Sequence, residues 1–381
     1  MDNYFKNRDF ANLERINRIK TELPYFCEEF FIGIENRTTT LTRLNYAYDL
    51  RVFFQFLSKK KWNKDVLSIT LDDMNSLDAS DIEIFVSSLS LYEINGKREH
   101  CSERGKARKL ATVRSFFKYF FNKGKLESNV AAKVAMPKLH DKEIIRLESE
   151  GKINEVAAIL NTTETGSGLT PRQQAYHTRT KSRDVAILTL FLGTGIRISE
   201  LVGLNVGDID FATNSFVVTR KGGNRTILYF SDEVRYPLMA YQEEKTKKNQ
   251  EKDAPFFLSL QDKRISVRSV ENLVKKYAQI VSPLKKITPH KLRSTFGTNL
   301  YRSTGDIYIV ADCLGHKDVN TTKKHYAAIT EAVKAKNCPI LGTFSCRGYD
   351  TFGPFKLIGG MAKGHPDADD LQRARAFIQA L

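Results

Sequence analysis

The sequence has few of the residues that bind metals or form disulfides. It holds five cysteines and seven histidines in 381 residues. The cysteines are odd in number, scattered and without a C-x-x-C pair, a pattern that favours reduced, buried thiols in a cytoplasm over disulfides. Because cysteine and histidine are so dispersed, a zinc site and a metal-dependent nuclease are both disfavoured. We therefore expect a protein that uses no metal and no cofactor.

Long apolar runs are also lacking. No run approaches the roughly 18 residues that a transmembrane helix needs. The start of the chain, MDNYFK, does not form the apolar core of a secretory signal. We expect a cytoplasmic location and no membrane partner.

Acidic residues are fewer than basic ones. Lys and Arg number 60 against 44 Asp and Glu, which gives a net charge of +16 and a pI of about 9.5. This excess suits a polyanionic partner, usually nucleic acid, although charge alone also fits a well-solvated surface. At 381 residues the chain is long enough for two domains, each with its own core.

Apolar residues at helical spacing predict a helical first part of the chain. Residues 40–59, 81–89 and 102–122 each carry an apolar stripe with this period. The pattern breaks at Pro137, and the later part mixes helices with a hairpin signal in residues 215–230. A polar, Gly- and Thr-rich stretch, residues 164–181, is expected to be a mobile loop. The expected fold is mainly α with a small β-sheet.

These breaks divide the chain into five parts. We expect an N-terminal extension (1–20), a helical domain (21–137), a linker (138–143), a mixed α/β domain (144–335) and a tail (336–381). The end of the tail, residues 367–381, has the apolar spacing of an amphipathic helix.

One predicted helix, residues 102–122, combines an aromatic face with a cluster of basic residues around the rest of its surface. The basic residues are Arg104, Lys106, Arg108, Lys109, Arg114 and Lys118. A helix packed through aromatics with cations outward is well built to lie against phosphates, and we expect these six to bind DNA. The alternative is an ordinary solvated helix face.

Four segments of the chain carry residues that could together cleave a phosphodiester. They are TGIRISEL (194–201), VTRKGGNRTI (218–227), TPHKLRSTFGTNL (288–300) and LGHKDVNTTKKHY (314–326). Cleavage without metal needs a nucleophile, cations that neutralise the pentacoordinate phosphate, and a proton for the departing oxygen. Each segment alone fits ordinary caps, turns and surface charges. The set, in this order, is specific.

Together the four segments resemble those of the tyrosine recombinases of the phage-integrase group, which includes the bacterial Xer resolvases and the integrases of mobile elements. The resemblance extends from Lys20 to about Ile329. It implies a two-domain DNA clamp, with a helical core-binding domain and a mixed α/β catalytic domain of the tyrosine recombinase type. The implied activity is site-specific recombination through a covalent 3′-phosphotyrosyl bond and a Holliday junction, independent of metal and ATP. Integration or excision of a mobile element and Xer-type resolution both remain open.

The resemblance also implies which residues bind the phosphate. Arg197 and Arg293 would clamp the scissile phosphate, and His316 would hydrogen-bond it. Glu200 would orient the site from behind these residues.

The remaining implied roles concern the bond-breaking step. Tyr326 would be the nucleophile, Lys221 the general acid, and His290 would assist proton transfer. The implied partners are a double-stranded DNA target site, three further copies of the chain in a homotetramer, and an accessory DNA-bending or directionality factor. The implied location is bacterial and nucleoid-associated. We expect the tail to dock on a neighbouring protomer.

Three alternatives stay open on the sequence. A type IB topoisomerase-like enzyme would use the same nucleophile as a monomer to relax supercoils. A DNA-binding protein that has lost catalysis would use the basic helix alone. A basic protein with no role on nucleic acid is the third.

Overall fold

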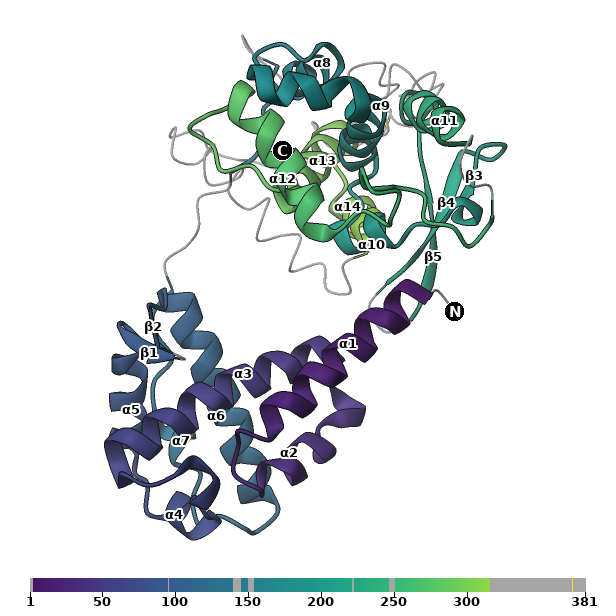
Figure 1. The fold of residues 1–381 in the computed structure, drawn as a ribbon. Helices are drawn as coiled ribbons and strands as arrows, with labels where there is room; N and C mark the ends of the chain where they lie inside the picture. Colours follow the sequence, from purple (N-terminus) through teal and green to yellow (C-terminus); the bar gives the residue numbers. More distant parts are fainter. Residues whose placement is uncertain are drawn as a thin grey trace. The chain divides into compact units, whose positions relative to one another are not determined.

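The computed structural model of the chain describes residues 3–94, 96–139, 145–149, 154–220, 223–246 and 251–315, together with residue 372 (Figure 1). The chain divides into two compact units, Met1–Lys142 and Glu143–Leu381. This boundary falls inside the stretch that the sequence marks as a linker, residues 138–143.

The described part of the first unit is built almost entirely of helices. They are α1 (Asn3–Lys20), α2 (Cys27–Gly33), α3 (Thr40–Leu57), α4 (Leu71–Asn75), α5 (Ala79–Ser88), α6 (Glu103–Asn122) and α7 (Val130–Lys133). A small hairpin, β1 (Tyr92–Ile94) and β2 (Lys97–Glu99), stands between α5 and α6. The helices predicted at 40–59, 81–89 and 102–122 are confirmed as α3, α5 and α6.

Phenylalanine side chains form the centre of this unit. Phe53 and Phe54 of α3 are fully buried, and their rings meet Phe85 and Phe116 edge to face at 5.0 and 5.6 Å between centroids. Edge-to-face pairs add about 0.5–1.5 kcal/mol each beyond the burial of their surface. The apolar stripe of α6 therefore packs in the core, and the polar residues of this helix lie on its opposite side.

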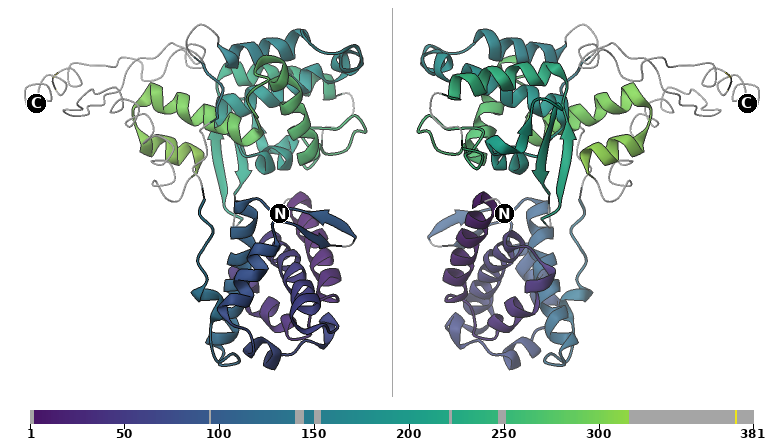
Figure 2. Two further views of the ribbon diagram at one scale, coloured as in Figure 1. Left: turned by 90° about the vertical axis from the view of Figure 1, so that its left-hand side faces the viewer. Right: turned by 90° about the vertical axis from the view of Figure 1, so that its right-hand side faces the viewer.

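The described part of the second unit mixes helices with one sheet. Its helices are α8 (Glu155–Thr165), α9 (Pro171–Thr194), α10 (Ile198–Gly203), α11 (Asp232–Thr246), α12 (Val267–Val281), α13 (Pro289–Thr304) and α14 (Ile307–Leu314). The strands β3 (Ile209–Asp210), β4 (Ser215–Thr219) and β5 (Arg225–Tyr229) pair in that order, all antiparallel. Figure 2 shows β4 and β5 side by side as the expected hairpin. In the register of this pair, Val217 lies opposite Ile227. The fold is mainly α with small sheets, as predicted.

The expected loop at residues 164–181 is wrong for its second half. Helix α9 begins at Pro171, and Thr170 caps it by accepting a hydrogen bond from the Gln173 backbone N–H. The Gln173 side chain accepts in return from the Thr170 N–H, so the two residues form a capping box. The polar composition reflects a helix with much exposed surface, and not a loop.

Asp184 fastens α9 to α12. This carboxylate is buried and accepts hydrogen bonds from Lys276 Nζ and Tyr277 Oη, both at 3.0 Å. Arg183, its neighbour in sequence, donates to the same group at 2.8 Å. Helix α9, which leads directly into the site described below, is thus held by a buried and fully paired charge.

Glu233, in the first turn of α11, is partly buried, and one of its carboxylate oxygens is not compensated by a hydrogen bond among the described residues. Its Oε1 atom is shielded from solvent and has no hydrogen-bond partner among the described residues. Burial raises the pKa of this carboxyl to about 7 because removal from water disfavours the charged form. Helix α11 packs on α9, where a Cβ on Gly193 would lie 2.4 Å from a methyl of Val234.

Because Glu233 has a raised pKa in the folded chain, we expect the free energy of unfolding to fall as the pH rises from about 4.5 to 7. In that range the folded chain holds a proton on Glu233 that the unfolded chain has lost, so ionisation favours unfolding. Glu233→Gln is expected to remove this slope and to raise the free energy of unfolding at pH 8 by on the order of 1 kcal/mol, since the group keeps some contact with solvent. Thermal melts from pH 4 to 8 measure the effect. Glu243→Gln, at an exposed position of the same helix, should leave the slope unchanged, and an unchanged slope in the Glu233 variant would contradict the assignment.

Candidate active site

Arg197 is positioned by a glycine turn and a buried carboxylate. Helix α9 ends at Gly195, whose φ of 61° is left-handed and whose Cβ, if present, would lie 2.4 Å from the Phe296 ring. The chain then turns so that Arg197 precedes the first residue of α10. Glu200 accepts a hydrogen bond from the Arg197 backbone N–H at 3.0 Å and another from its Nη1 at 2.8 Å. Because this carboxylate is buried, it fixes both ends of the arginine.

Arg293 lies on α13 and is only 6% exposed. Its Nη1 donates to the carbonyl oxygen of Gly195, and its Nη2 donates to the carbonyl oxygen of Leu314. Burial and the nearby charge of Arg197 lower the pKa of this guanidinium to about 10. It therefore stays charged at neutral pH.

The two guanidinium groups converge on one oxygen. Arg197 Nη2 also donates to the carbonyl of Leu314, at 3.2 Å, and to that of Gly315 at the same distance. These carbonyls belong to the C-terminal end of α14, where backbone acceptors lack intrahelical partners and the helix dipole is negative. Side chains from residues 197 and 293, nearly a hundred positions apart, thus act on a single acceptor.

A third arginine, which the sequence analysis did not single out, reaches the same helix end. Arg220 follows β4, and its Nη2 donates to the carbonyl of Cys313 at 3.4 Å. The sequence feature that could have pointed to Arg220 is its position directly before Lys221, at the start of the hairpin turn.

His290 lies in the first turn of α13, one turn before Arg293. Pro289 occupies the first helical position, as predicted, and His290 is exposed while Arg293 is buried. The other predicted catalytic positions, Lys221, His316 and Tyr326, lie outside the described residues. In the sequence Lys221 directly follows Arg220, and His316 directly follows Gly315.

The six basic residues of α6 divide into those that face outward and those that do not. Lys109 is 6% exposed, and its Nζ donates at 3.1 Å to Asp49, a fully buried carboxylate of α3 that also binds Arg108. Arg114 donates to the backbone carbonyls of residues 131, 132 and 134 at the end of α7. The expectation that all six side chains point outward is therefore wrong for Lys109, whose charge is needed to pair Asp49.

Arg104 and Lys118 are the basic residues of α6 that stay exposed and have no ion-pair or hydrogen-bond partner in the described part of the chain. They are 14 residues apart, close to four helical turns, so they lie on one face about 21 Å apart. Lys106 is partly buried and pairs with Glu103 at 2.8 Å.

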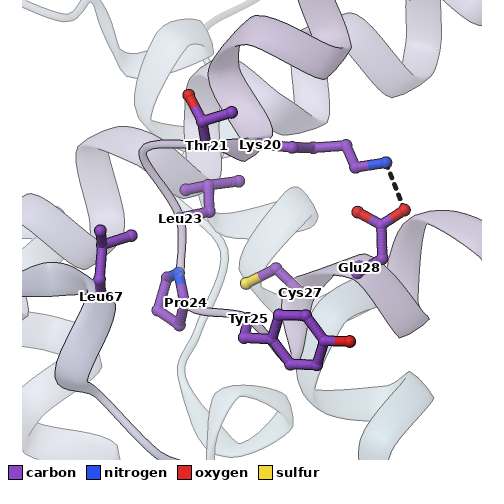
Figure 3. A pocket seen from close by; sticks show the side chains of 8 residues that line it. All are labelled: Lys20, Thr21, Leu23, Pro24, Tyr25, Cys27, Glu28 and Leu67. Carbon is purple, nitrogen blue, oxygen red and sulfur yellow. Dashed lines mark hydrogen bonds and ion pairs between the residues drawn. The ribbon is translucent and has the colours of Figure 1, made fainter.

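The described residues hold neither a metal-ligand cluster nor a membrane helix. Within them, no three His, Cys, Asp or Glu side chains are grouped so that they could bind a metal ion. None of their helices is both long and apolar enough to span a bilayer. A hollow of about 300 Å³ in the first unit is lined by residues from the end of α1 to the start of α2 and by Leu67, and an ion pair between Lys20 and Glu28 at 2.6 Å lies at its side (Figure 3). It holds none of the predicted catalytic residues.

Comparison with known proteins decides the family. The sequence model of the phage integrase family matches residues 153–332. A tyrosine recombinase XerC of Caldanaerobacter subterraneus is 31% identical over 315 residues, which cover 79% of this chain and 82% of that relative. The chain belongs to the phage integrase family of tyrosine recombinases. A tyrosine recombinase XerS of Lactococcus lactis is 29% identical over 354 residues, with 84% of this chain and 97% of the relative covered.

Solved structures agree with this family in fold. An XerH recombinase in a post-cleavage complex with its DNA substrate superposes with a TM-score of 0.57 at 16% identity, over 79% of this chain and 81% of that one. The Tn1549 transposon integrase in complex with circular intermediate DNA also gives 0.57, at 18% identity, over 83% and 100% of the two chains. The predicted enzyme class, a site-specific recombinase of the tyrosine type, is confirmed at the level of the family. The topoisomerase-like and non-catalytic alternatives lose their support.

Proposed function

We propose that this tyrosine recombinase cuts and rejoins double-stranded DNA at specific sites through a 3′-phosphotyrosyl bond to Tyr326. The observation that carries the proposal is the convergence of Arg197 and Arg293 on the Leu314 carbonyl oxygen. Two forked cations that meet at one acceptor are suited to the non-bridging oxygens of a single phosphate. Each guanidinium has five N–H donors, and the bonds to Gly195 and Leu314 occupy two of those on Arg293.

The arginine pair supplies the electrostatic part of the reaction. Negative charge increases on the phosphate as it becomes pentacoordinate, and preorganised cations aimed at that charge are usually the largest catalytic contribution. A tyrosine hydroxyl has an ordinary pKa of about 10, so the same cations favour its ionised, nucleophilic form. Glu200 keeps Arg197 in place through its hydrogen bonds to the backbone N–H and Nη1 of that residue.

The remaining groups form the new bond, transfer protons and bind the phosphate. Tyr326 would lose its hydroxyl proton with the assistance of His290, and its Oη would form a bond to phosphorus while the bond to the 5′ oxygen breaks. Lys221 would donate the proton that this leaving oxygen takes, and His316 would hydrogen-bond the phosphate. Attack by a 5′-hydroxyl of a partner strand then reverses the step, so no ATP is needed because the phosphodiester energy is kept in the covalent bond.

The experiment is covalent capture on nicked DNA. The purified chain is incubated with a pool of duplexes that carry a random site and a nick, so that the short cut piece diffuses away and traps the adduct. We expect protein–DNA adducts that survive denaturant, with the protein on the 3′ end of a recurring sequence. No adduct, or attachment at a 5′ end, would contradict the proposal.

We propose that the parts of the chain divide the work as the sequence suggests. Residues 21–137 and 144–335 would bind duplex DNA between them, joined by the linker 138–143 and preceded by the extension 1–20. Four copies would assemble on two sites, with the tail 336–381 docked on a neighbour. Accessory DNA-bending or directionality factors would act on this assembly. The relatives include Xer recombinases and a transposon integrase, so both kinds of task fit. Sizing of the complex on site DNA with and without the tail tests the assembly.

The exposed face of α6 is the proposed DNA contact of the first unit. Arg104→Ala with Lys118→Ala is expected to weaken binding and to reduce the slope of log affinity against log salt by about two, one for each phosphate contact. Lys109→Ala should instead destabilise the fold and leave that slope unchanged, because this lysine pairs Asp49. Anisotropy titrations at several salt concentrations distinguish the two. An unchanged slope in the double variant would remove this face from the interface.

A further inference from the structure

Arg220 connects the β4–β5 hairpin to the end of α14. Its backbone is fixed at the base of the turn, since its N–H donates to the Asn224 carbonyl at 2.8 Å and its own carbonyl accepts from Gly223 at 3.0 Å. From this fixed base its Nη2 donates to the Cys313 carbonyl at 3.4 Å, 93 residues further along the chain.

The guanidinium of Arg220 also lies directly against Gly315. This glycine ends α14 with a φ of 57°, and a Cβ at this position would lie 1.7 Å from Arg220 Nη1. Any side chain at residue 315 would therefore displace the arginine.

Three arginines together hold the last turn of α14. Arg220 binds the carbonyl of Cys313, Arg293 that of Leu314, and Arg197 those of Leu314 and Gly315. Cations at a helix C-terminus are favourable, and the orphan carbonyls there need donors. Arg220 comes from the β4–β5 hairpin, whereas Arg293 lies on α13 and Arg197 directly precedes α10. Removing Arg220 takes this donor away from the Cys313 carbonyl and leaves the bonds from Arg197 and Arg293 to the carbonyls of Leu314 and Gly315.

We propose that Arg220 is a positioning residue that fixes the C-terminus of α14 to the base of the β4–β5 hairpin. This inference rests on the proposed function, in which residues just beyond both contact points take part in the chemistry. The residue after Arg220 is Lys221, and the chain beyond Gly315 begins with His316 and continues to Tyr326. One guanidinium thus sets the distance between the strand that leads to the acid and the helix end that leads to the nucleophile.

The first test needs no DNA. In Arg220→Ala, backbone amides in residues 310–315 should exchange hydrogen for deuterium at least about tenfold faster, because the last turn of α14 opens more often. Arg268→Ala is the matched control, since this arginine is 80% exposed and pairs with Glu271 on its own helix. Unchanged exchange in the Arg220 variant would overturn the proposal.

The second test measures cleavage at saturating DNA. We expect Arg220→Ala to slow adduct formation by about 100-fold, as expected for a misplacement of about 1 Å, with the Kd for DNA within threefold. Arg220→Lys, which keeps a donor, should recover part of the rate. A substrate with sulfur at the 5′ leaving position needs no proton, so it should restore Lys221→Ala but not Arg220→Ala.

The outcomes separate the two proposals. Full recovery of Arg220→Ala on the sulfur substrate would mean that it acts only through the acid, and an unchanged rate on ordinary DNA would mean that it does not act; either result overturns the positioning role. If the unaltered chain forms no adduct with any site, the proposed function fails, while the exchange result still reports on Arg220 by itself.

Discussion

Replacing Arg293 with lysine is expected to slow covalent adduct formation by about 1000-fold, the upper range for loss of a preorganised donor. The arginine serves Gly195 and Leu314 through separate nitrogens and still has donors for a phosphate. A lysine has one ammonium group, which cannot hold both carbonyls and a phosphate in a forked geometry. Burial at this position would also lower the pKa of a lysine, and a lysine starts from a lower pKa than an arginine, so it would be closer to losing its charge. The pKa of Arg293 is still about 10.

Single-turnover cleavage of a nicked site measures this effect. Arg302→Lys is the matched control, because it makes the same exchange on the same helix but at a partly exposed position whose ion pair with Glu148 spans 3.8 Å. We expect that variant to cleave at the normal rate. A rate for Arg293→Lys within threefold of normal would mean that this guanidinium does not bind the scissile phosphate.

Replacing Tyr326 with phenylalanine is expected to abolish the adduct, with a loss of at least about 10⁴-fold, because the atom that forms the covalent bond is gone. Affinity for site DNA should change by less than twofold, since the aromatic ring remains. Gel analysis under denaturing conditions detects the adduct, and a parallel binding titration shows whether the variant still finds its site. Tyr349→Phe, at the next tyrosine in the sequence, should behave normally. Persistent adduct in Tyr326→Phe would identify another nucleophile.

Much of the fold could be predicted from local patterns. The period of apolar residues located α3, α5 and α6, and two β-rich runs around Gly222 and Gly223 located the hairpin. The start of α9 was missed because its first turns are polar, and its beginning is marked by the Thr170–Gln173 capping box and by Pro171 at its first position, not by an apolar period. Periodicity detects a helix through the face it buries, so a helix with much exposed surface gives a weak signal.

The site was predictable to the extent that its residues lie in recognisable segments. Arg197 and Arg293 could be named together from their motifs, and the structure brings them to one oxygen. Arg220 could not be named, because its partners are backbone carbonyls of a distant helix and no sequence pattern encodes them. The error at Lys109 has the same origin: Asp49, 60 residues earlier, turns this charge inward. The spacing of residues in a single sequence does not show which polar groups far apart in the chain will pair in the fold.

The Leu314 carbonyl gives both arginines of the pair an internal acceptor when no DNA is present. An isolated buried guanidinium would cost several kcal/mol, and the helix end removes that cost. The internal bonds use only some of the guanidinium N–H groups, and the others remain for a phosphate. The end of α14 therefore keeps both cations in a fixed arrangement before DNA arrives, and little reorganisation is left for the moment of reaction.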